Sequence, residues 1–268
     1  MTDPLFLLDT DHEDTPVNYD ELDTGWKLTL PKSVSRHAIS AMRLEPGDRL
    51  QLSDGRGLRI HACLTDKATA QAEVVRFSKE AQPTLRLSLI QALAKSGHDQ
   101  QAIDAATQIG VDSVIPWQAD RSIAKWKPGK SQGHWQQTLR AASEQSRRAW
   151  VPQLEDCINS KGVLAVCRRA CVHGDMVVVL HQDAACSWKD IEEGVAAMAE
   201  HCLDDGRPRT INLLVGPEGG ISDQEIELFT GAGAMVCQLG DNIMRASLAG
   251  PVALSLLSRA LGRFGRVS

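Results

Sequence analysis

The spacing of apolar residues changes near residue 80 of this 268-residue chain. Before that point, short stretches alternate between apolar and polar positions, which is typical of strands with one buried face. The alternation predicts a barrel-like unit of short strands with one helix. We expect strands over residues 26–30 and 69–77, a hairpin over 47–64 that turns at Asp54-Gly55, and a helix over 33–43 capped by Ser33.

After Pro83, nearly continuous apolar runs alternate with helical patterns, which is typical of an α/β domain with a parallel sheet. The predicted strands span residues 85–93, 111–117, 175–182, 210–216 and 234–240. The predicted helices span residues 98–110, 133–148, 163–171, 188–202, 222–233 and 251–262, and Gly110 is a candidate cap of the first. We therefore expect two domains, residues 1–80 and 81–268.

A glycine-rich turn, Gly216-Pro217-Glu218-Gly219-Gly220, separates one predicted strand from a helix that Ser222 and Glu225 begin as a capping box. Open α/β sheets bind ligands at such strand ends, and glycines let the backbone approach a ligand. No Lys-Ser/Thr pair follows the glycines, so this is not a phosphate-binding P-loop, and it does not match GxGxxG. The turn serves either a ligand or the fold alone.

Two further strand ends have comparable loops. One follows the strand that ends near Leu180 and His181, and the other runs from Leu239 and Gly240 to Arg245. In the last helix we expect Ser247 as a cap and Pro251 in the first turn. Arg245 is either a functional cation or the partner of a surface salt bridge. We expect the three loops to converge on one ligand.

The net charge of −5 is unevenly distributed. Residues 1–30 hold eight acids and one lysine, and residues 10–24 are predicted to form a loop. Residues 121–169 hold ten Lys/Arg against three Asp/Glu, which suits either a phosphate-contacting face or a solvated surface. The acidic N-terminus differs from a signal peptide and no long apolar run is present, so we expect a cytoplasmic protein. Seven scattered cysteines favour reduced thiols, and we expect no metal.

Several motifs together resemble one known family. They are LLVGPEGGISDQEIELF followed by QLGDNIMRASLAGPVAL, QALAKSGHDQQAIDAATQIGVDSVIPWQADRS, RAASEQSRRAWVPQL and RHAISAMRLEPGDRLQLSDGRG. They resemble the signatures of the SPOUT methyltransferases, and within these the RsmE family of bacterial 16S rRNA (uridine-N3)-methyltransferases. The resemblance extends over nearly the whole chain.

The resemblance implies a PUA-like β-barrel that binds RNA, followed by a SPOUT-type α/β domain with a C-terminal trefoil knot. It also implies S-adenosylmethionine (AdoMet) as cofactor, a homodimer, and 16S rRNA or the small ribosomal subunit as partner. The catalytic candidates are Arg245 and Glu218. The implied cofactor-binding residues are Leu180, His181, Gly216, Pro217, Glu218, Gly219, Gly220, Leu239, Gly240, Ile243, Met244, Arg245 and Ser247. The candidate RNA-binding residues are His37, Arg43, Arg56, Arg121, Arg140, Arg147 and Arg148.

One segment departs from the family pattern. The family's Arg-Thr-Glu-Thr-Ala is replaced here by Arg245-Ala246-Ser247-Leu248-Ala249, which has no carboxylate. Glu218 and Asp241 are the nearby candidates to supply one. Two alternatives stand beside uridine-N3 methylation. One is a SPOUT enzyme of different target, such as a ribose 2′-O-methyltransferase, and the other is a catalytically weak RNA-binding or ribosome-assembly protein, which the altered segment supports.

Overall fold

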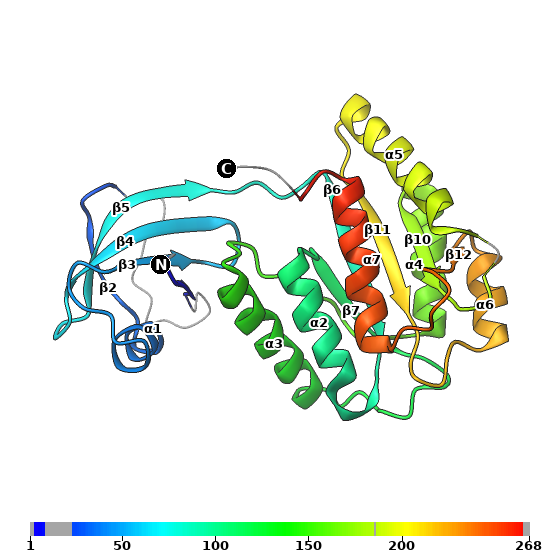
Figure 1. Cartoon of the computed structure of the whole chain (residues 1–268), viewed down its shortest axis with the longest axis horizontal. Coiled ribbons are helices and arrows are strands. Elements are labelled where there is room, and N and C mark those ends of the chain that lie inside the picture. Colours follow the sequence, from blue (N-terminus) through cyan, green and yellow to red (C-terminus); the bar gives the residue numbers. More distant parts are fainter. Residues whose placement is uncertain (1–2, 9–22, 185, 265–268) are drawn as a thin grey trace. The chain divides into compact units, whose positions relative to one another are not determined.

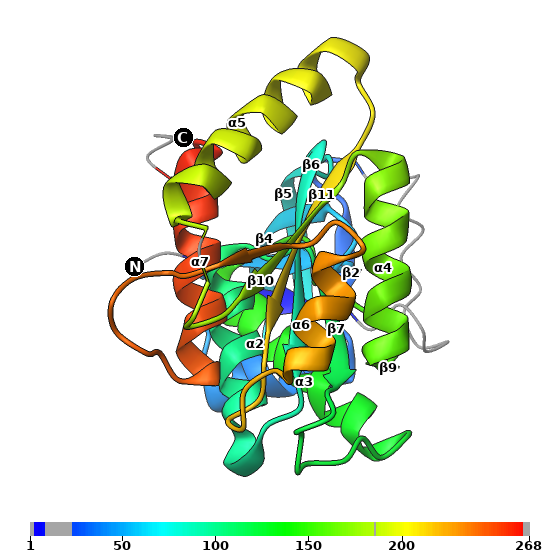
Figure 2. The same cartoon turned by 90° about the vertical axis from the view of Figure 1, so that its right-hand side faces the viewer.

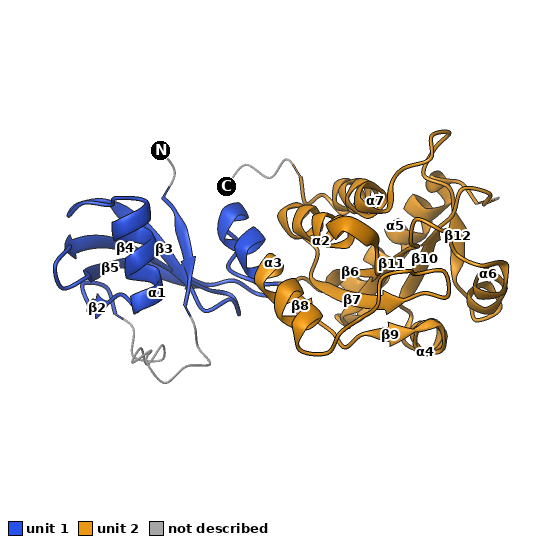
Figure 3. Cartoon of the chain, turned by 90° about the horizontal axis from the view of Figure 1, so that it is seen from below, with its two compact units in different colours: residues 1–82, 140–151 blue, residues 83–139, 152–268 orange. Residues whose placement is uncertain are grey.

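The computed structural model describes residues 3–8, 23–184 and 186–264 (Figure 1). The chain forms two compact units, coloured separately in Figure 3. Unit 1 comprises residues 1–82 and 140–151, and unit 2 comprises residues 83–139 and 152–268. Of the loop predicted over residues 10–24, all but the last two residues lie outside the described part of the chain.

Unit 1 is built on a five-stranded mixed sheet in the order β1-β3-β4-β5-β2. Only β1 and β3 run parallel; the other pairs are antiparallel. Alternate residues of β3 and β4, among them Leu50, Leu52 and Ile60, are fully buried, as the alternating pattern predicts. The strands are β1 (Leu5–Leu7), β2 (Lys27–Thr29), β3 (Arg49–Ser53), β4 (Leu58–Asp66) and β5 (Gln71–Lys79).

The helix predicted over residues 33–43 begins one residue before its predicted cap. Helix α1 (Lys32–Ser35) continues as a π-helical segment over Arg36–Ala41, and its N-cap residue is Pro31. The prediction that Ser33 caps this helix is wrong, because Pro31 takes the extended conformation at the helix entrance and Ser33 follows inside the first turn.

Unit 2 is a parallel sheet in the order β12-β10-β11-β6-β7-β8, and β9 also pairs with β7. Its strands are β6 (Leu85–Ala92), β7 (Ser113–Gln118), β8 (Gln153–Leu154), β9 (Ile158–Asn159), β10 (Met176–Leu180), β11 (Arg209–Val215) and β12 (Met235–Cys237). Its helical elements are a 3₁₀ turn (Lys95–Gly97), α2 (His98–Ile109), α4 (Ser160–His173), α5 (Trp188–Asp205), α6 (Asp223–Thr230) and α7 (Ala246–Ala260). Helix α3 (Lys130–Ser146) belongs to unit 2 up to Leu139 and to unit 1 from Arg140.

Helices cover both faces of this sheet (Figure 2). Helices α2 and α7 lie on one face, and α4 and α6 lie on the other. Because both faces are covered, the strands are apolar at consecutive positions, and every residue from Ile211 to Val215 is buried. Helix α7 approaches the sheet closely, since a Cβ atom at Gly250 would lie 3.1 Å from Leu89 Cδ1.

The start of α7 differs from the prediction. The helix begins at Ala246 with Arg245 as its N-cap residue, so Ser247 lies inside the first turn and is not the cap. Pro251 lies well inside the helix instead of in the first turn. A proline there lacks one helical hydrogen bond, and burial of this part of α7 against α2 and the sheet offsets the loss. The predicted caps of two other helices, Gly110 after α2 and the Ser222–Glu225 capping box of α6, are confirmed.

Candidate active site

Five parallel strands of unit 2 end along one edge of the sheet. The register aligns Gln91 of β6 with Val215 of β11, Val215 with Leu180 of β10, and Leu180 with Cys237 of β12. Strand β7 ends beside β6, where Ala92 pairs with Trp117. The loops that follow these strands therefore leave the sheet at the same edge, where α/β folds bind ligands.

A cavity of about 910 Å³ lies among these loops. The three loops singled out in the sequence all line it, as the expected convergence requires. All but one of the residues proposed to bind the cofactor lie in its wall, the exception being Ser247. The wall contains Leu180, His181, Gly216, Pro217, Glu218, Gly219, Gly220, Leu239, Gly240, Ile243, Met244 and Arg245.

The glycines of the Gly216–Gly220 turn meet distinct steric demands. A Cβ atom at Gly216 would lie 2.6 Å from Ile221 Cγ1, which leaves no room for a side chain. Gly220 has a φ of +73°, a backbone conformation that favours glycine, and its N–H donates to the carbonyl of Pro217 at 2.9 Å. The fold alone therefore requires glycine at both positions, and the same turn forms part of the cavity wall.

Glu218 connects this turn to the start of α2. Its Oε1 accepts the backbone N–H of Lys95 at 3.0 Å and lies 3.2 Å from Nδ1 of His98. Partial burial raises the pKa of Glu218, but these hydrogen bonds lower it by more, so that its pKa lies below the ordinary value. A carboxylate held in this way fixes the position of the turn. His98 also lines the cavity and was not singled out in the sequence; its place at the start of the helix that follows β6 is the signal that could have identified it.

Glu225 has a second role beyond its capping box. The side chain is 2% exposed, and its Oε1 accepts the Ser160 hydroxyl at 2.6 Å and the Asp120 backbone N–H at 3.0 Å. Its Oε2 accepts the backbone N–H and the hydroxyl of Ser222, each at 3.0 Å. Burial raises the pKa of Glu225, and the hydrogen bonds lower it by more, so the carboxylate is charged at neutral pH. One buried charge thereby fixes three segments, the loop after β7 and the starts of α4 and α6.

Arg245 lies at the start of α7, with its exposed side chain at the cavity. Within the described part of the chain its guanidinium makes no hydrogen bond or ion pair, so the surface salt bridge considered above is absent there. The cavity wall also contains the carboxylates of Asp183, Asp223 and Asp241. The site thus combines an available cation with several acidic groups.

The candidate RNA-binding residues divide between the two units. Arg121 belongs to unit 2 and lines the cavity, and the other candidates belong to unit 1. His37 and Arg43 are exposed, and the His37 ring lies edge-on to Phe6 with 5.3 Å between ring centroids. Arg56 is exposed as well. Arg140 is only partly exposed, and its Nη2 donates to the carbonyl of Leu8 at 3.5 Å.

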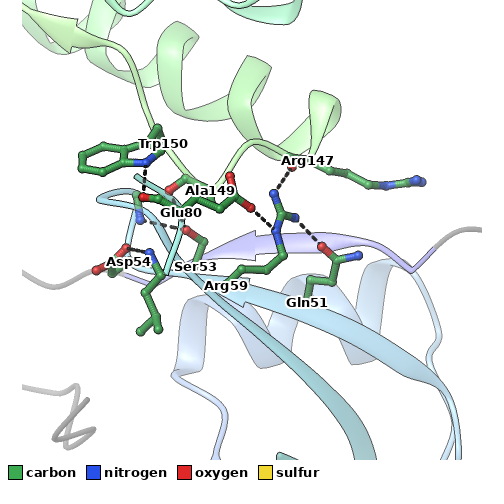
Figure 4. Close-up of polar contacts among 10 residues, drawn as sticks. Gln51, Ser53, Asp54, Arg59, Glu80, Arg147, Ala149 and Trp150 are labelled. Atoms are coloured by element: carbon green, nitrogen blue, oxygen red, sulfur yellow. Dashed lines mark hydrogen bonds and ion pairs between the residues drawn. The ribbon is translucent and has the colours of Figure 1, made fainter. Parts of the chain in front are cut away.

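Arg147 and Arg148 follow α3, and their segment is hydrogen-bonded to the sheet of unit 1 (Figure 4). Arg59 donates from Nη2 to the carbonyl of Arg147 at 3.0 Å, from Nε to Glu80 at 2.6 Å and from Nη1 to Gln51 at 2.6 Å. Arg147 itself has a φ of +56°, which is unusual for a residue with a side chain. Its side chain extends away from this cluster.

Further bonds hold the residues that follow. Ser53 Oγ donates to the carbonyl of Ala149, and Trp150 Nε1 donates to the carbonyl of Glu80, each at 2.9 Å. These hydrogen bonds include one between residues almost a hundred positions apart in the chain, so the sequence pattern gave no indication of them.

Comparison with known proteins identifies the family. A family model described as an RNA methyltransferase domain matches residues 80–258, and a second, described as an RNA methyltransferase PUA domain, matches residues 30–75. The chain belongs to this RNA methyltransferase family. The first match covers the sheet and all the loops of the cavity, and the second covers β3, β4 and the first part of β5 in unit 1.

Members of the family with curated names are similar over most of their length. The chain is 32% identical over 250 residues to "Ribosomal RNA small subunit methyltransferase E" of Mycobacterium tuberculosis, covering 90% of each chain. It is 26% identical over 230 residues to the Bacillus subtilis protein of the same name, covering 83% of this chain and 86% of that one. The crystal structure of the Neisseria gonorrhoeae enzyme of this name, bound to S-adenosyl methionine, has a TM-score of 0.76 at 25% identity and covers 96% of this chain and 98% of that one.

These matches confirm the predicted fold class, a PUA-like domain followed by an α/β methyltransferase domain. The trefoil knot stays a prediction, because the strand order does not describe how the chain is threaded. No helix in the described residues is both long and apolar enough to span a bilayer. Within the same residues, no three His, Cys, Asp or Glu side chains form a group that could hold a metal ion.

Proposed function

We propose that this protein transfers a methyl group from AdoMet to N3 of a uridine in 16S rRNA of the small ribosomal subunit. The observation that carries the proposal is the cavity at the strand ends, where the Gly216–Gly220 turn and the loop before Arg245 meet. Membership in the RNA methyltransferase family supports the reaction class. An rRNA substrate places the reaction in the cytoplasm.

The residues of the cavity fit AdoMet. Its volume of about 910 Å³ suits a ligand of that size. Leu239, Ile243 and Met244 would provide apolar contacts, and the Gly216–Gly220 turn and Leu180–His181 would provide backbone groups. The carboxylates of Asp183, Asp223 and Asp241 suit a ligand that carries a positive sulfonium and an ammonium group. When bound, AdoMet supplies a methyl group on a sulfonium, which is a good leaving group.

The protein's own residues must then prepare the base. Uridine N3 carries a proton, and the ring becomes nucleophilic when that proton is lost and negative charge spreads over N3, O2 and O4. The guanidinium of Arg245 stabilises this charge. Asp241 is the stronger candidate to accept the proton, because an oxygen of Glu218 is already bonded to Lys95 and His98. Glu218 serves to hold the turn in place.

We further propose that the enzyme is a homodimer with its cofactor sites near the subunit interface. Ile243 in the loop before α7 is 80% exposed, and Leu248 in the first turns of α7 is 51% exposed. Apolar side chains exposed this far beside a ligand site are typical of a surface that a second subunit covers. Sedimentation analysis tests this proposal, and a monomer at micromolar concentration contradicts it.

Calorimetry and methyl transfer test the function together. We expect saturable AdoMet binding to the wild-type protein and transfer of labelled methyl groups to small-subunit rRNA. Arg245→Ala is expected to slow transfer by about 100-fold, the typical effect of removing one group that stabilises an oxyanion. Binding without transfer to free rRNA or assembled subunits supports the alternative of a weak RNA-binding or assembly protein, to which the altered Arg245–Ala249 segment points.

A further inference from the structure

Arg121 lies on the loop after β7, at the edge of the sheet where the cavity forms. It lines the cavity although it comes from none of the three loops singled out in the sequence. Its side chain is exposed, which on a surface loop would suit a mobile arginine. The residues on either side of it indicate otherwise.

Both neighbours of Arg121 are anchored to the protein interior. The N–H of Asp120 donates to the buried carboxylate of Glu225 at 3.0 Å. Ser122 is 4% exposed, and its Oγ donates to the carbonyl of Leu93 at 3.0 Å. The backbone that carries Arg121 is thereby fixed on each side, while the side chain itself is directed to the cavity. A functional side chain is held most precisely when surrounding hydrogen bonds fix its backbone in this way.

The guanidinium of Arg121 extends over the glycine-rich turn. Its Nη1 donates to the carbonyls of Gly219 and Ile221 through long hydrogen bonds of 3.4 Å each. A Cβ atom at Gly219 would lie 3.3 Å from Cβ of Arg121, so the two residues are in close contact. Nε and Nη2 make no hydrogen bond within the described residues. Arg121 thus retains donors for a ligand beside the turn.

The chemistry of the base calls for more than one cation. The uracil anion carries its charge on N3, where the new bond forms, and on O2 and O4, which lie on either side of N3. One guanidinium cannot face both carbonyl oxygens and leave N3 open to the methyl group in line. Arg245, from the loop before α7, and Arg121, from the loop after β7, reach the cavity from different segments.

We propose that Arg121 is a catalytic residue that contacts a carbonyl oxygen of the target uracil and stabilises the charge left when N3 loses its proton. This inference rests on the function proposed above. It reassigns Arg121 from the phosphate contact expected from the sequence to a contact with the reacting base.

The test compares Arg121→Gln and Arg121→Lys with Lys125→Gln, which removes an exposed charge on the same loop outside the cavity wall. Single-turnover methyl transfer is measured across a range of pH, together with the dissociation constants for AdoMet and rRNA. We expect Arg121→Gln to slow transfer by about 100-fold at neutral pH, with AdoMet affinity nearly unchanged. The deficit shrinks as the pH rises, because uridine N3 then loses its proton without help. Arg121→Lys retains part of the rate, and Lys125→Gln behaves as wild type.

Two results would overturn this assignment. In the first, Arg121→Gln lowers the rate of methyl transfer equally at every pH and weakens rRNA binding, and the salt dependence of rRNA binding falls by about one ion. This result identifies Arg121 as a phosphate contact. Loss of AdoMet binding in both Arg121 variants identifies it as a support of the turn. Absence of uridine-N3 methylation by the wild-type protein contradicts the proposed function itself, and the two failures are thereby distinguishable.

Discussion

Replacement of Glu225 by glutamine tests whether one buried carboxylate holds the loops of the site together. The amide keeps one oxygen, which can still accept the bonds from Asp120 and Ser160. Its NH₂ group then faces the N–H of Ser222, which loses its acceptor. A buried donor without a partner costs about 1–3 kcal/mol, and the loss of charge from the remaining bonds costs about 1 kcal/mol more.

We therefore expect Glu225→Gln to lower the free energy of unfolding by about 3 kcal/mol and Tm by about 6–12 °C. Calorimetric melting measures the change, and Glu227→Gln, an exposed position on the same helix, is the matched control. A stability within about 0.5 kcal/mol of the wild type, the usual range for surface substitutions, would refute the reasoning.

The same carboxylate predicts a pH dependence. The pKa of Glu225 is depressed in the folded protein, so its contribution to stability is complete above the pKa of the unfolded state. The contribution is lost as the pH falls through the folded pKa. Melting temperatures of wild type and Glu225→Gln should therefore converge in acid and separate toward neutral pH. A difference in Tm that stays constant over this range would contradict the assignment.

Three further changes give distinct outcomes. Gly220→Ala forces a side chain into a backbone with φ of +73°, at a cost of about 1–2 kcal/mol, and calorimetry should show weaker AdoMet binding. Glu218→Gln removes the carboxylate charge that accepts the Lys95 N–H and lies beside Nδ1 of His98, and it should weaken AdoMet binding a few-fold without unfolding the protein; unchanged affinity would contradict its role in the turn. Arg59→Gln breaks the hydrogen bond to the Arg147 carbonyl, and it should lower the stability of unit 1 by about 2 kcal/mol and weaken rRNA binding. The exposed Arg76→Gln should do neither, and equal effects of the two substitutions would contradict the role of this hydrogen bond.

The elements whose signal is local in the sequence were predictable. The Ser222–Glu225 capping box and the Gly110 cap each depend on residues a few positions apart, and both predictions are confirmed. The predicted start of α7 was wrong because we placed Pro251 in the first turn, where proline is common, whereas packing extends the helix back to Ala246.

The long-range interactions that assemble the site could not be predicted from local sequence patterns. Glu225 contacts Asp120 and Ser160, which lie 105 and 65 residues away, and no local pattern marks such a pair. The position of Arg121 beside the turn follows from the sheet order, which places β7 next to β6 and β6 next to β11. Membership in the family was recognisable because its motifs are contiguous stretches, and the comparisons confirm it.

The most direct test of the central claim is to identify the product. Purified enzyme is incubated with AdoMet and small ribosomal subunits that lack the modification, and the 16S rRNA is digested to nucleosides for mass spectrometry. The account predicts one new N3-methyluridine per rRNA, which Arg245→Ala forms far more slowly. A ribose-methylated nucleoside, or no methylated product from a protein that binds AdoMet, would contradict it.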